Sequence, residues 1–324
     1  MKILVTGSAS HLARALLPRL LNDSRIKRIV GVDLRDARFR HPHYHHKVLD
    51  VRSPDIAGLM KGTDAVVHLA FVVLQSDLGK KRLDRGWIRD SDVRGSQNVF
   101  AAAAQHGVPR LVHCSSAAVY DLAHWHKGAI TESHPRAALP GFGYAEDKIA
   151  VENWLDELEQ THPQARLIRL RPHVIVGPRA QPFLNYLARS RFYPLLPDPQ
   201  PLTQCVHEAD VAQALHLALF AEASGAFNLA PADSLSVRDM RRVLHRRPLA
   251  LSYGFMRGLL AFGWRFLGIG TDPAWMETLR YNLVLHTRRA RKELGWTPQY
   301  DSVKDCLLAL EPQRAARGRA IDPA

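Results

Sequence analysis

The stretch MKILVTGSASHLARALLPRLL (residues 1–21) sets the pattern for the rest of the chain. Its apolar run Lys2–Thr6 is typical of a β-strand. The leucines that follow recur at helical spacing up to residues 22–23, and Gly7 lies between the two patterns. A strand, a tight turn and a helix form the first part of a βαβ unit.

Strand patterns and helix patterns alternate beyond this stretch. Strands are predicted at 29–33, 47–49, 65–70, 110–115 and 165–170, and helices at 91–106 and 144–159. Such alternation predicts right-handed crossovers and a parallel sheet covered on both faces. We therefore expect an α/β fold of the Rossmann type, with a doubly wound parallel sheet.

The pattern changes near residue 172. Prolines crowd the stretch 194–201, and a short helix at 208–221 and a strand at 226–229 follow. We predict a nucleotide-binding domain at 1–171 and a smaller, mostly helical substrate region at 172–311, interleaved with the first. The Arg/Ala/Pro-rich residues 312–324 are predicted to form a flexible tail.

Composition narrows the class of protein. The 324 residues include 44 Lys+Arg and 31 Asp+Glu, a net charge of +13, which favours anionic ligands. No zinc-finger spacing or aromatic-basic string accompanies this charge, so we expect no nucleic-acid partner. The three cysteines lie far apart, the N-terminal apolar run is too short for a signal peptide, and no apolar run reaches about 18 residues. These features predict a cytoplasmic protein.

The turn after the first strand is a candidate anion site. Backbone N–H groups and the helix dipole favour a pyrophosphate at a helix N-terminus. Ser10 and Ala13 stand where a dinucleotide loop usually has glycine, so this motif alone also fits a plain strand–helix connection. Asp33, 26 residues after Gly7, is positioned to bind ribose hydroxyls and favours NAD. Arg35 could hold a 2′-phosphate, which keeps NADP as the less favoured alternative.

A second set of residues indicates catalysis. Ser116 follows a predicted strand, and Tyr144 and Lys148 are four residues apart, on one face of a predicted helix. An ammonium near a phenol lowers the pKa of the tyrosine, which can then exchange a proton with a substrate while hydride moves to or from nicotinamide. Ser116 would hydrogen-bond the same substrate oxygen.

With these motifs in place, the chain resembles the extended short-chain dehydrogenase/reductase superfamily, in particular its NAD-dependent epimerase/dehydratase family. The resemblance extends over nearly the whole chain and rests on the segments 5–7, 32–33, 68–70, 93–99, 115–120, 144–148, 171–172, 206–211 and 293–296. It implies Ser116, Tyr144 and Lys148 as the catalytic residues, with a nicotinamide pocket lined by 171–178. It also implies a homodimer in which each subunit contributes two helices to a bundle.

The cofactor-binding residues predicted from the motifs and the resemblance together are Gly7, Ser10, His11, Leu12, Asp33, Arg35, Asp50, Val51, Leu69, Ala70, Tyr144, Lys148, Arg171, Pro172 and Val174.

Departures from the family pattern bear on the substrate. Asp92 stands where the family usually has asparagine, Val174 where nucleotide-sugar enzymes place a substrate-binding asparagine, and Thr203 near their arginine. The string 170–178 is more similar to the branch of 3β-hydroxysteroid dehydrogenases and dihydroflavonol-type reductases. We expect an NAD-dependent oxidoreductase acting on a secondary alcohol or ketone, with an apolar substrate as one option. The alternatives are a nucleotide-sugar epimerase or dehydratase that regenerates NAD, and a non-catalytic dinucleotide sensor.

Candidate substrate contacts come from the loop between the catalytic elements and from the segment after the last predicted strand: they are His124, Trp125, His173 and Arg179. A separate histidine cluster at 41–46 has no carboxylate or cysteine at a zinc-like spacing. It is interpreted as a solvated loop, and no metal site is expected.

The stretch 249–270 is rich in apolar residues. As a helix it would carry one stripe formed by Phe255, Leu259, Phe262, Phe266 and Ile269, and a second formed by Leu260, Trp264 and Leu267. One stripe would face the core. The other would face a hydrophobic substrate, a dimer partner or a membrane surface, or both would be buried. Arginines upstream make peripheral membrane contact through 249–270 a hypothesis.

Overall fold

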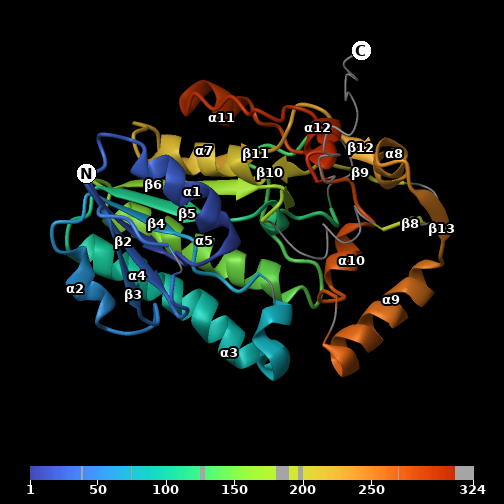
Figure 1. Ribbon diagram of the computed structural model, residues 1–324, viewed down its shortest axis with the longest axis horizontal. Coiled ribbons are helices and arrows are strands. Elements are labelled where there is room, and N and C mark those ends of the chain that lie inside the picture. Colours follow the sequence, from blue (N-terminus) through green and yellow to red (C-terminus); the bar gives the residue numbers. More distant parts are fainter. Residues whose placement is uncertain are drawn as a thin grey trace, which may run out of the picture.

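The computed structural model describes residues 1–37, 39–73, 75–124, 128–179, 190–195, 200–268 and 270–310. Seven parallel strands form its central sheet in the order β11-β6-β5-β4-β1-β2-β3 (Figure 1). Their bounds are β1 (Lys2–Thr6), β2 (Arg28–Asp33), β3 (Tyr44–Val48), β4 (Ala65–His68), β5 (Arg110–Cys114), β6 (Arg166–Pro172) and β11 (Gly225–Leu229). The predicted Rossmann-type sheet is confirmed.

Helices cover both faces of the sheet, because its strands are apolar on both sides. On one face, α1 (His11–Leu21) and α7 (Glu208–Ala218) pack against the side chains of Ile3, Val5 and their neighbours. On the other, α2 (Ile56–Met60), α4 (Gly95–Gln105) and α5 (Gly143–Thr161) enclose a second core cluster that includes Leu4 and Val66. Figure 1 shows these two helical layers on opposite sides of the strands.

Two predicted elements have different bounds. The strand predicted at 47–49 begins at Tyr44, so His45 and His46 belong to β3 instead of a loop. β3 is an edge strand, whose backbone can pair with β2 while polar side chains face solvent. The helix predicted at 91–106 begins earlier, with α3 (Arg85–Arg89), and reaches α4 through a π-helical turn, Asp90–Arg94.

The chain returns to the sheet after residue 172. The strand predicted at 226–229 is β11, which pairs in parallel with β6 and extends the sheet, while α7 covers it. Both elements lie within residues 172–311, which were predicted from sequence as a substrate region interleaved with the first domain. The local sequence pattern of a strand does not show which strand it pairs with.

The remaining described elements form the C-terminal part of the molecule. They are β7 (Ile175–Val176), β8 (Phe192–Leu195), β9 (Leu202–Thr203), β10 (Val206–His207), β12 (Leu235–Ser236), α8 (Val237–Val243), β13 (Arg247–Ala250), α9 (Tyr253–Phe262), a π-helical turn (Gly263–Leu267), α10 (Trp275–Thr278), α11 (Arg288–Glu293) and α12 (Val303–Leu308), and two 3₁₀ segments precede them at Gln75–Leu83 and Ala117–Val119.

The apolar stretch 249–270 is not buried on both sides. The four described members of its first stripe, Phe255, Leu259, Phe262 and Phe266, are 54–72% exposed. The second stripe is split: Trp264 is buried, but Leu267 is 60% exposed. The π-helical turn explains this difference, because its wider turn shifts the positions that follow around the helix axis. Ile269 lies outside the described residues.

Candidate active site

A cavity of about 700 Å³ opens at the carboxyl end of the sheet. Such a volume suits a cofactor or a small-molecule ligand. Its walls come from the ends of β1, β2, β4 and β5, from α5, and from segments of the C-terminal part. Open α/β sheets bind ligands at this edge, outside the carboxyl ends of the strands.

The turn between β1 and α1 forms one end of the cavity. Gly7 has a φ of +67°, and a Cβ atom there would lie 2.6 Å from the backbone nitrogen of Ala70. Only glycine permits this approach of the two backbones. Ser10 is the N-cap of α1 and accepts a hydrogen bond from the Ala13 amide at 3.2 Å. The first helical residues, His11 and Leu12, line the cavity, so the N-terminus of α1 opens onto it.

Asp33 and Arg35 lie beside this turn. The Asp33 carboxylate accepts hydrogen bonds from the backbone amides of Ala9 and Arg35, each at 3.0 Å. The Arg35 side chain is 57% exposed, with its Nε atom 3.4 Å from Asp33 Oδ1. A carboxylate has lone pairs left after two such contacts, so Asp33 can also accept from ribose hydroxyls. The turn, the α1 N-terminus and Asp33 together fit an adenine dinucleotide.

Other predicted cofactor residues also line the cavity: these are Asp50, Val51, Leu69, Ala70, Pro172 and Val174. The Asp50 carboxylate is held by Arg52, whose Nη2 lies 2.6 Å from Asp50 Oδ2. The hydrogen bonds and charge of Arg52 lower the pKa of Asp50. Asp50 is therefore an anion in the segment between β3 and α2, where this segment lines the cavity.

The three predicted catalytic residues meet in the same cavity. Ser116, Tyr144 and Lys148 all line it, although 28 residues separate the serine from the tyrosine. Lys148 is buried, and its Nζ donates a hydrogen bond to the Cys114 carbonyl at 2.7 Å. The same Nζ lies 3.5 Å from the centre of the Phe71 ring. An ammonium has three donors, so two remain for a bound ligand.

The pKa of Tyr144 is raised, whereas the sequence-based argument expected it to be lowered by Lys148. Burial is the main cause, and a hydrogen bond with the Ser116 hydroxyl acts in the opposite direction. The Lys148 ammonium is directed at a backbone carbonyl and lies 6.0 Å from the Tyr144 ring centre. The four-residue spacing correctly predicted that Tyr144 and Lys148 share a helix face. It did not predict the direction in which the pKa of Tyr144 shifts, because that direction depends on burial.

A buried carboxylate accompanies Lys148. Asp92 lies in the π-helical turn, and its Oδ1 accepts from the Val72 amide at 2.8 Å. Its Oδ2 is buried and has no hydrogen-bond partner among the described residues. Burial raises the pKa of Asp92 and lowers that of Lys148, while each charge favours the ionised form of the other.

We therefore expect Asp92→Asn to lower the pKa of Lys148, because the substitution removes a nearby carboxylate. If protonated Lys148 is required, the high-pH limb of kcat/KM moves to lower pH by about one unit. Asp90→Asn is the control, since Asp90 contacts Arg52 and Arg94 on the outer side of the turn. An unchanged limb in the Asp92 variant would contradict this coupling.

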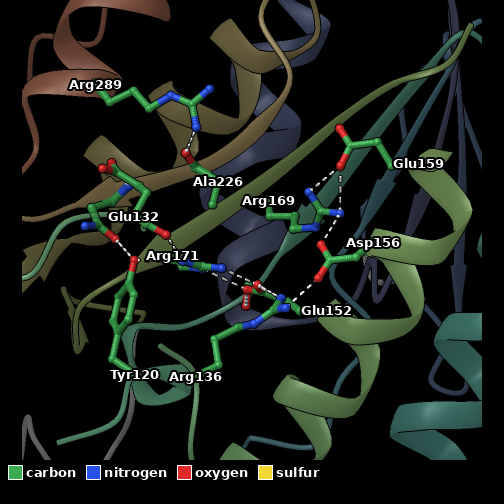
Figure 2. A network of polar contacts seen from close by, with 12 residues as sticks. Tyr120, Glu132, Arg136, Glu152, Asp156, Glu159, Arg169, Arg171, Ala226 and Arg289 are labelled. Atoms are coloured by element: carbon green, nitrogen blue, oxygen red, sulfur yellow. Dashed lines mark hydrogen bonds and ion pairs between the residues drawn. The ribbon is translucent and has the colours of Figure 1, made fainter. Parts of the chain in front are cut away.

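Arg171 has a different place from that predicted. It does not line the cavity but is buried behind it, where its guanidinium contacts Glu152 Oε2 at 2.5 Å and Tyr120 Oη at 2.9 Å. Figure 2 shows this ion network, in which Arg136 also contacts Glu152. Ser115 donates to the other Glu152 oxygen at 2.5 Å. The network fixes α5, and with it Tyr144 and Lys148, against β5 and β6.

The predicted substrate contacts are divided. His173 lines the cavity, but its Nδ1 accepts from the Val174 amide at 2.7 Å and its Nε2 lies 3.2 Å from the Leu283 carbonyl. Burial lowers the pKa of His173 to about 4. The Arg179 side chain lies outside the cavity, 3.4 Å from Glu208, and the exposed His124 contacts Asp121. Trp125 lies outside the described residues.

One part of the cavity wall is mainly apolar. It comes largely from the C-terminal part, with Val237, Met256, Leu260, Trp275, Met276, Leu279 and Leu283. The Trp275 ring centre lies 5.1 Å from that of Tyr144. Sequence reasoning offered a hydrophobic substrate as one option for the stripe that contains Leu260, but it missed the others, since nothing local indicates that they meet Tyr144. It also missed Phe71, although this residue directly follows the predicted strand 65–70.

Comparisons with known proteins show the family of this chain. A model of the "NAD dependent epimerase/dehydratase family" matches residues 3–230. An uncharacterized protein of Mycobacterium tuberculosis strain H37Rv is 25% identical over 317 residues, covering 93% of this chain and 81% of its own. A 4-hydroxy-2-methyl-3-oxo-4-farnesyl-3,4-dihydroquinoline-1-oxide ketoreductase of Stigmatella aurantiaca is 28% identical over 232 residues, covering 67% and 64%.

Among solved structures, the UDP-glucuronic acid 4-epimerase of Bacillus cereus in complex with NAD has a similar fold. Its TM-score is 0.73 at 18% identity, with 95% of this chain and 97% of that chain covered. The family match spans the whole sheet, from β1 to β11. The chain belongs to the NAD-dependent epimerase/dehydratase family of enzymes.

Proposed function

We propose that this chain is an NAD-dependent oxidoreductase that transfers hydride between nicotinamide and an apolar secondary alcohol or its ketone. One observation carries the proposal: Ser116, Tyr144 and Lys148 converge on a cavity that also has an apolar wall. The three polar residues provide for proton transfer. The apolar wall selects the substrate class.

The proposed roles follow from the contacts. Bound NAD supplies the hydride acceptor. In the oxidation, Tyr144 acts as its phenolate: it takes the hydroxyl proton of the alcohol and becomes a phenol as the carbon loses hydride, and in the reduction the phenol gives the proton back. Ser116 hydrogen-bonds the substrate oxygen and the tyrosine oxygen. Lys148, oriented by the Cys114 carbonyl, uses its remaining donors on the nicotinamide ribose, and its positive charge favours the phenolate form of Tyr144.

The charges around the cavity argue against a nucleotide-sugar substrate. Among its described lining residues the only arginine is Arg35, at the dinucleotide end, and the only lysine is Lys148. Val174 and Thr203 both line the cavity. At these positions, nucleotide-sugar enzymes that resemble this chain have polar or basic residues. A second pyrophosphate would meet few cations there. The ketoreductase relative, named for a farnesylated substrate, is in line with an apolar ligand.

The cofactor is proposed to be NAD, since a 2′-phosphate would lie against the Asp33 carboxylate. We expect Asp33→Ala to weaken NAD binding by about tenfold to a hundredfold, because hydrogen bonds to a charged group contribute about 1.5–3 kcal/mol. Titration with NAD, NADH, NADP and NADPH measures this. Asp36→Ala, at an exposed neighbouring acid, is the control. A wild-type preference for NADP that Arg35→Ala abolishes would show the assignment to be wrong.

The test of the reaction is the nicotinamide absorbance during incubation with NAD and either a sterol bearing a secondary hydroxyl or UDP-glucose. Net NADH formation with the sterol is expected. Conversion of UDP-glucose without net NADH would instead support the alternative, an epimerase or dehydratase that regenerates its cofactor. NAD binding without turnover of either compound would favour a non-catalytic sensor.

Two further expectations concern the protein as a whole. We propose a homodimer in which each subunit contributes two helices to a bundle, as the family resemblance implies, and a reducing, cytoplasmic compartment, because Cys114, Cys205 and Cys306 are all free thiols. Light scattering of the purified protein measures the oligomeric state.

A further inference from the structure

The outer surface of α9 carries a continuous apolar face. Phe255, Leu259, Phe262, Phe266 and Leu267, here called the α9 face, are each between 54% and 72% exposed. The rings of Phe262 and Phe266 lie 5.1 Å apart. In Figure 1, α9 projects at the edge of the molecule, away from the sheet. Scattered exposed apolar residues are ordinary, but a contiguous patch of this kind marks an interaction surface.

The inner side of the same helix forms the wall of the active-site cavity. Met256 and Leu260 line the cavity, and Met256 packs in one apolar cluster with Met276 of α10. A single helix therefore separates the substrate space from whatever contacts the α9 face. The helix is held at its far end by Arg82, which donates to the Trp264 carbonyl at 2.8 and 3.0 Å.

The segment that carries the α9 face is rich in arginine. Residues 238–268 contain seven arginines and one acidic residue, Asp239. Two of these arginines, Arg257 and Arg265, lie within α9 and the π-helical turn, and both are exposed, although Arg257 also pairs with Glu277 of α10 at 3.3 Å. The preceding strand β13 is exposed along its length and begins with Arg247. An amphipathic helix with arginines beside its apolar face is typical of proteins that lie in the interface of an anionic membrane.

Charge also decides between a membrane and a second copy of the chain. A twofold interface would place the α9 face against itself and bring the same arginines together. Anionic lipid headgroups would instead neutralise them, and each basic residue near such a surface strengthens binding. No helix in the described part of the chain has the length and apolar character needed to cross a bilayer.

We propose that the α9 face docks on an anionic bilayer and that a lipid-dissolved alcohol or ketone enters the cavity beneath α9. The substrate part of this inference rests on the proposed function, whereas the docking part does not. The aromatic side chains would insert at the headgroup level, and Met256 and Leu260 would offer the entering ligand an apolar path to Ser116 and Tyr144.

The first experiment is co-sedimentation of the full chain with vesicles of phosphatidylcholine alone or mixed with phosphatidylglycerol. Binding is expected to the mixed vesicles and to fall as salt is raised. The triple substitution F255S/F262S/F266S should weaken it by tenfold or more, and R257Q/R265Q by about an order of magnitude. The control V48S/L308S removes exposed apolar side chains elsewhere and should bind as the wild type does.

The second experiment measures turnover of a sterol with a secondary hydroxyl presented in the mixed vesicles, and of 2-octanol in water. The triple variant should lose most turnover of the vesicle-borne sterol but keep that of 2-octanol, since its three side chains do not line the cavity. Absence of turnover in the wild type, with vesicle binding intact, would contradict the proposed function and leave docking in place.

Three outcomes would overturn the docking proposal. The wild type could fail to bind the mixed vesicles at low salt, or the triple variant could bind them unchanged. The wild type could also be a dimer that the triple substitution converts to a monomer without any vesicle binding, which would assign the α9 face to a second copy. Unfolding midpoints of the variants show whether each remains folded.

Discussion

Tyr144→Phe is expected to lower kcat by about 10²- to 10⁴-fold, because it removes the group that exchanges a proton with the substrate oxygen. The ring should keep its place, since Phe71 and Trp275 pack against it and no charge is lost. NAD affinity should change little, because the cofactor contacts proposed for Lys148, Asp33 and the Gly7 turn remain. Initial rates of NADH formation and cofactor titration measure the two quantities separately.

Tyr281→Phe is the matched control for this result. Tyr281 lines the same cavity, but it comes from the C-terminal part, where it packs partly buried against an apolar cluster. Its loss of a hydroxyl should leave kcat within a few-fold of the wild type. If Tyr144→Phe retained wild-type turnover, the acid/base role of Tyr144 would be refuted. If both variants lost turnover equally, the cavity hydroxyls would act on substrate binding instead.

Glu152→Ala is expected to destabilise the fold by about 3–5 kcal/mol, because it leaves the buried guanidinium of Arg171 without its anionic partner. Glu152 is completely buried and contacts Arg171, Arg136 and Ser115 at the centre of the network in Figure 2. The free energy of unfolding in urea measures this loss. Turnover should fall as well, since Glu152 lies one helical turn beyond Lys148.

Glu157→Ala, on the exposed side of the same helix, should change stability by no more than about 0.5 kcal/mol. Equal losses of stability in Glu152→Ala and Glu157→Ala would show that the buried ion network does not contribute more to the free energy of unfolding than an exposed carboxylate does. Glu152→Gln should fall between them, since its single amide oxygen keeps only part of the hydrogen bonds that Glu152 accepts and its charge is lost.

Acid should also weaken this network. Burial by itself would raise the pKa of Glu152, but the hydrogen bonds and charge of Arg171 outweigh it, and the pKa lies below the ordinary 4.5. A carboxyl whose pKa is lower in the folded state stabilises the fold above its unfolded-state pKa. That contribution is lost as the pH falls below about 4.5 and through the folded-state pKa, and Glu152→Gln should lack it.

Much of the sheet could be predicted because its signals are local. The run Lys2–Thr6 and the leucines after Gly7 carry their own periodicity, and the same holds for β2, β5 and α5. The edge strands were harder to predict. The polar residues of β3 concealed where that strand begins, and the pairing of β11 with β6 could not be predicted, because strand order depends on pairing and not on local pattern.

The convergence of the proposed catalytic residues was predictable for the same local reason. Tyr144 and Lys148 share a helix face by their spacing, and Ser116 follows a strand that ends at the sheet edge where parallel α/β proteins bind ligands. The charge environment was not predictable. Burial raises the pKa of Tyr144, and Arg171 turns away from the cavity because Glu152 and Tyr120 lie on the other side.

The sequence by itself determined a parallel Rossmann-type sheet, the turn at Gly7 and a shared face for Tyr144 and Lys148, since periodicity and spacing act over a few residues. Only the tertiary structure decided that Met256, Leu260 and Trp275 form an apolar wall of the cavity that Tyr144 lines. It also decided which stripe of 249–270 stays exposed. Burial is a property of contacts between segments far apart in the chain, and no local pattern fixes which of two apolar faces finds a partner.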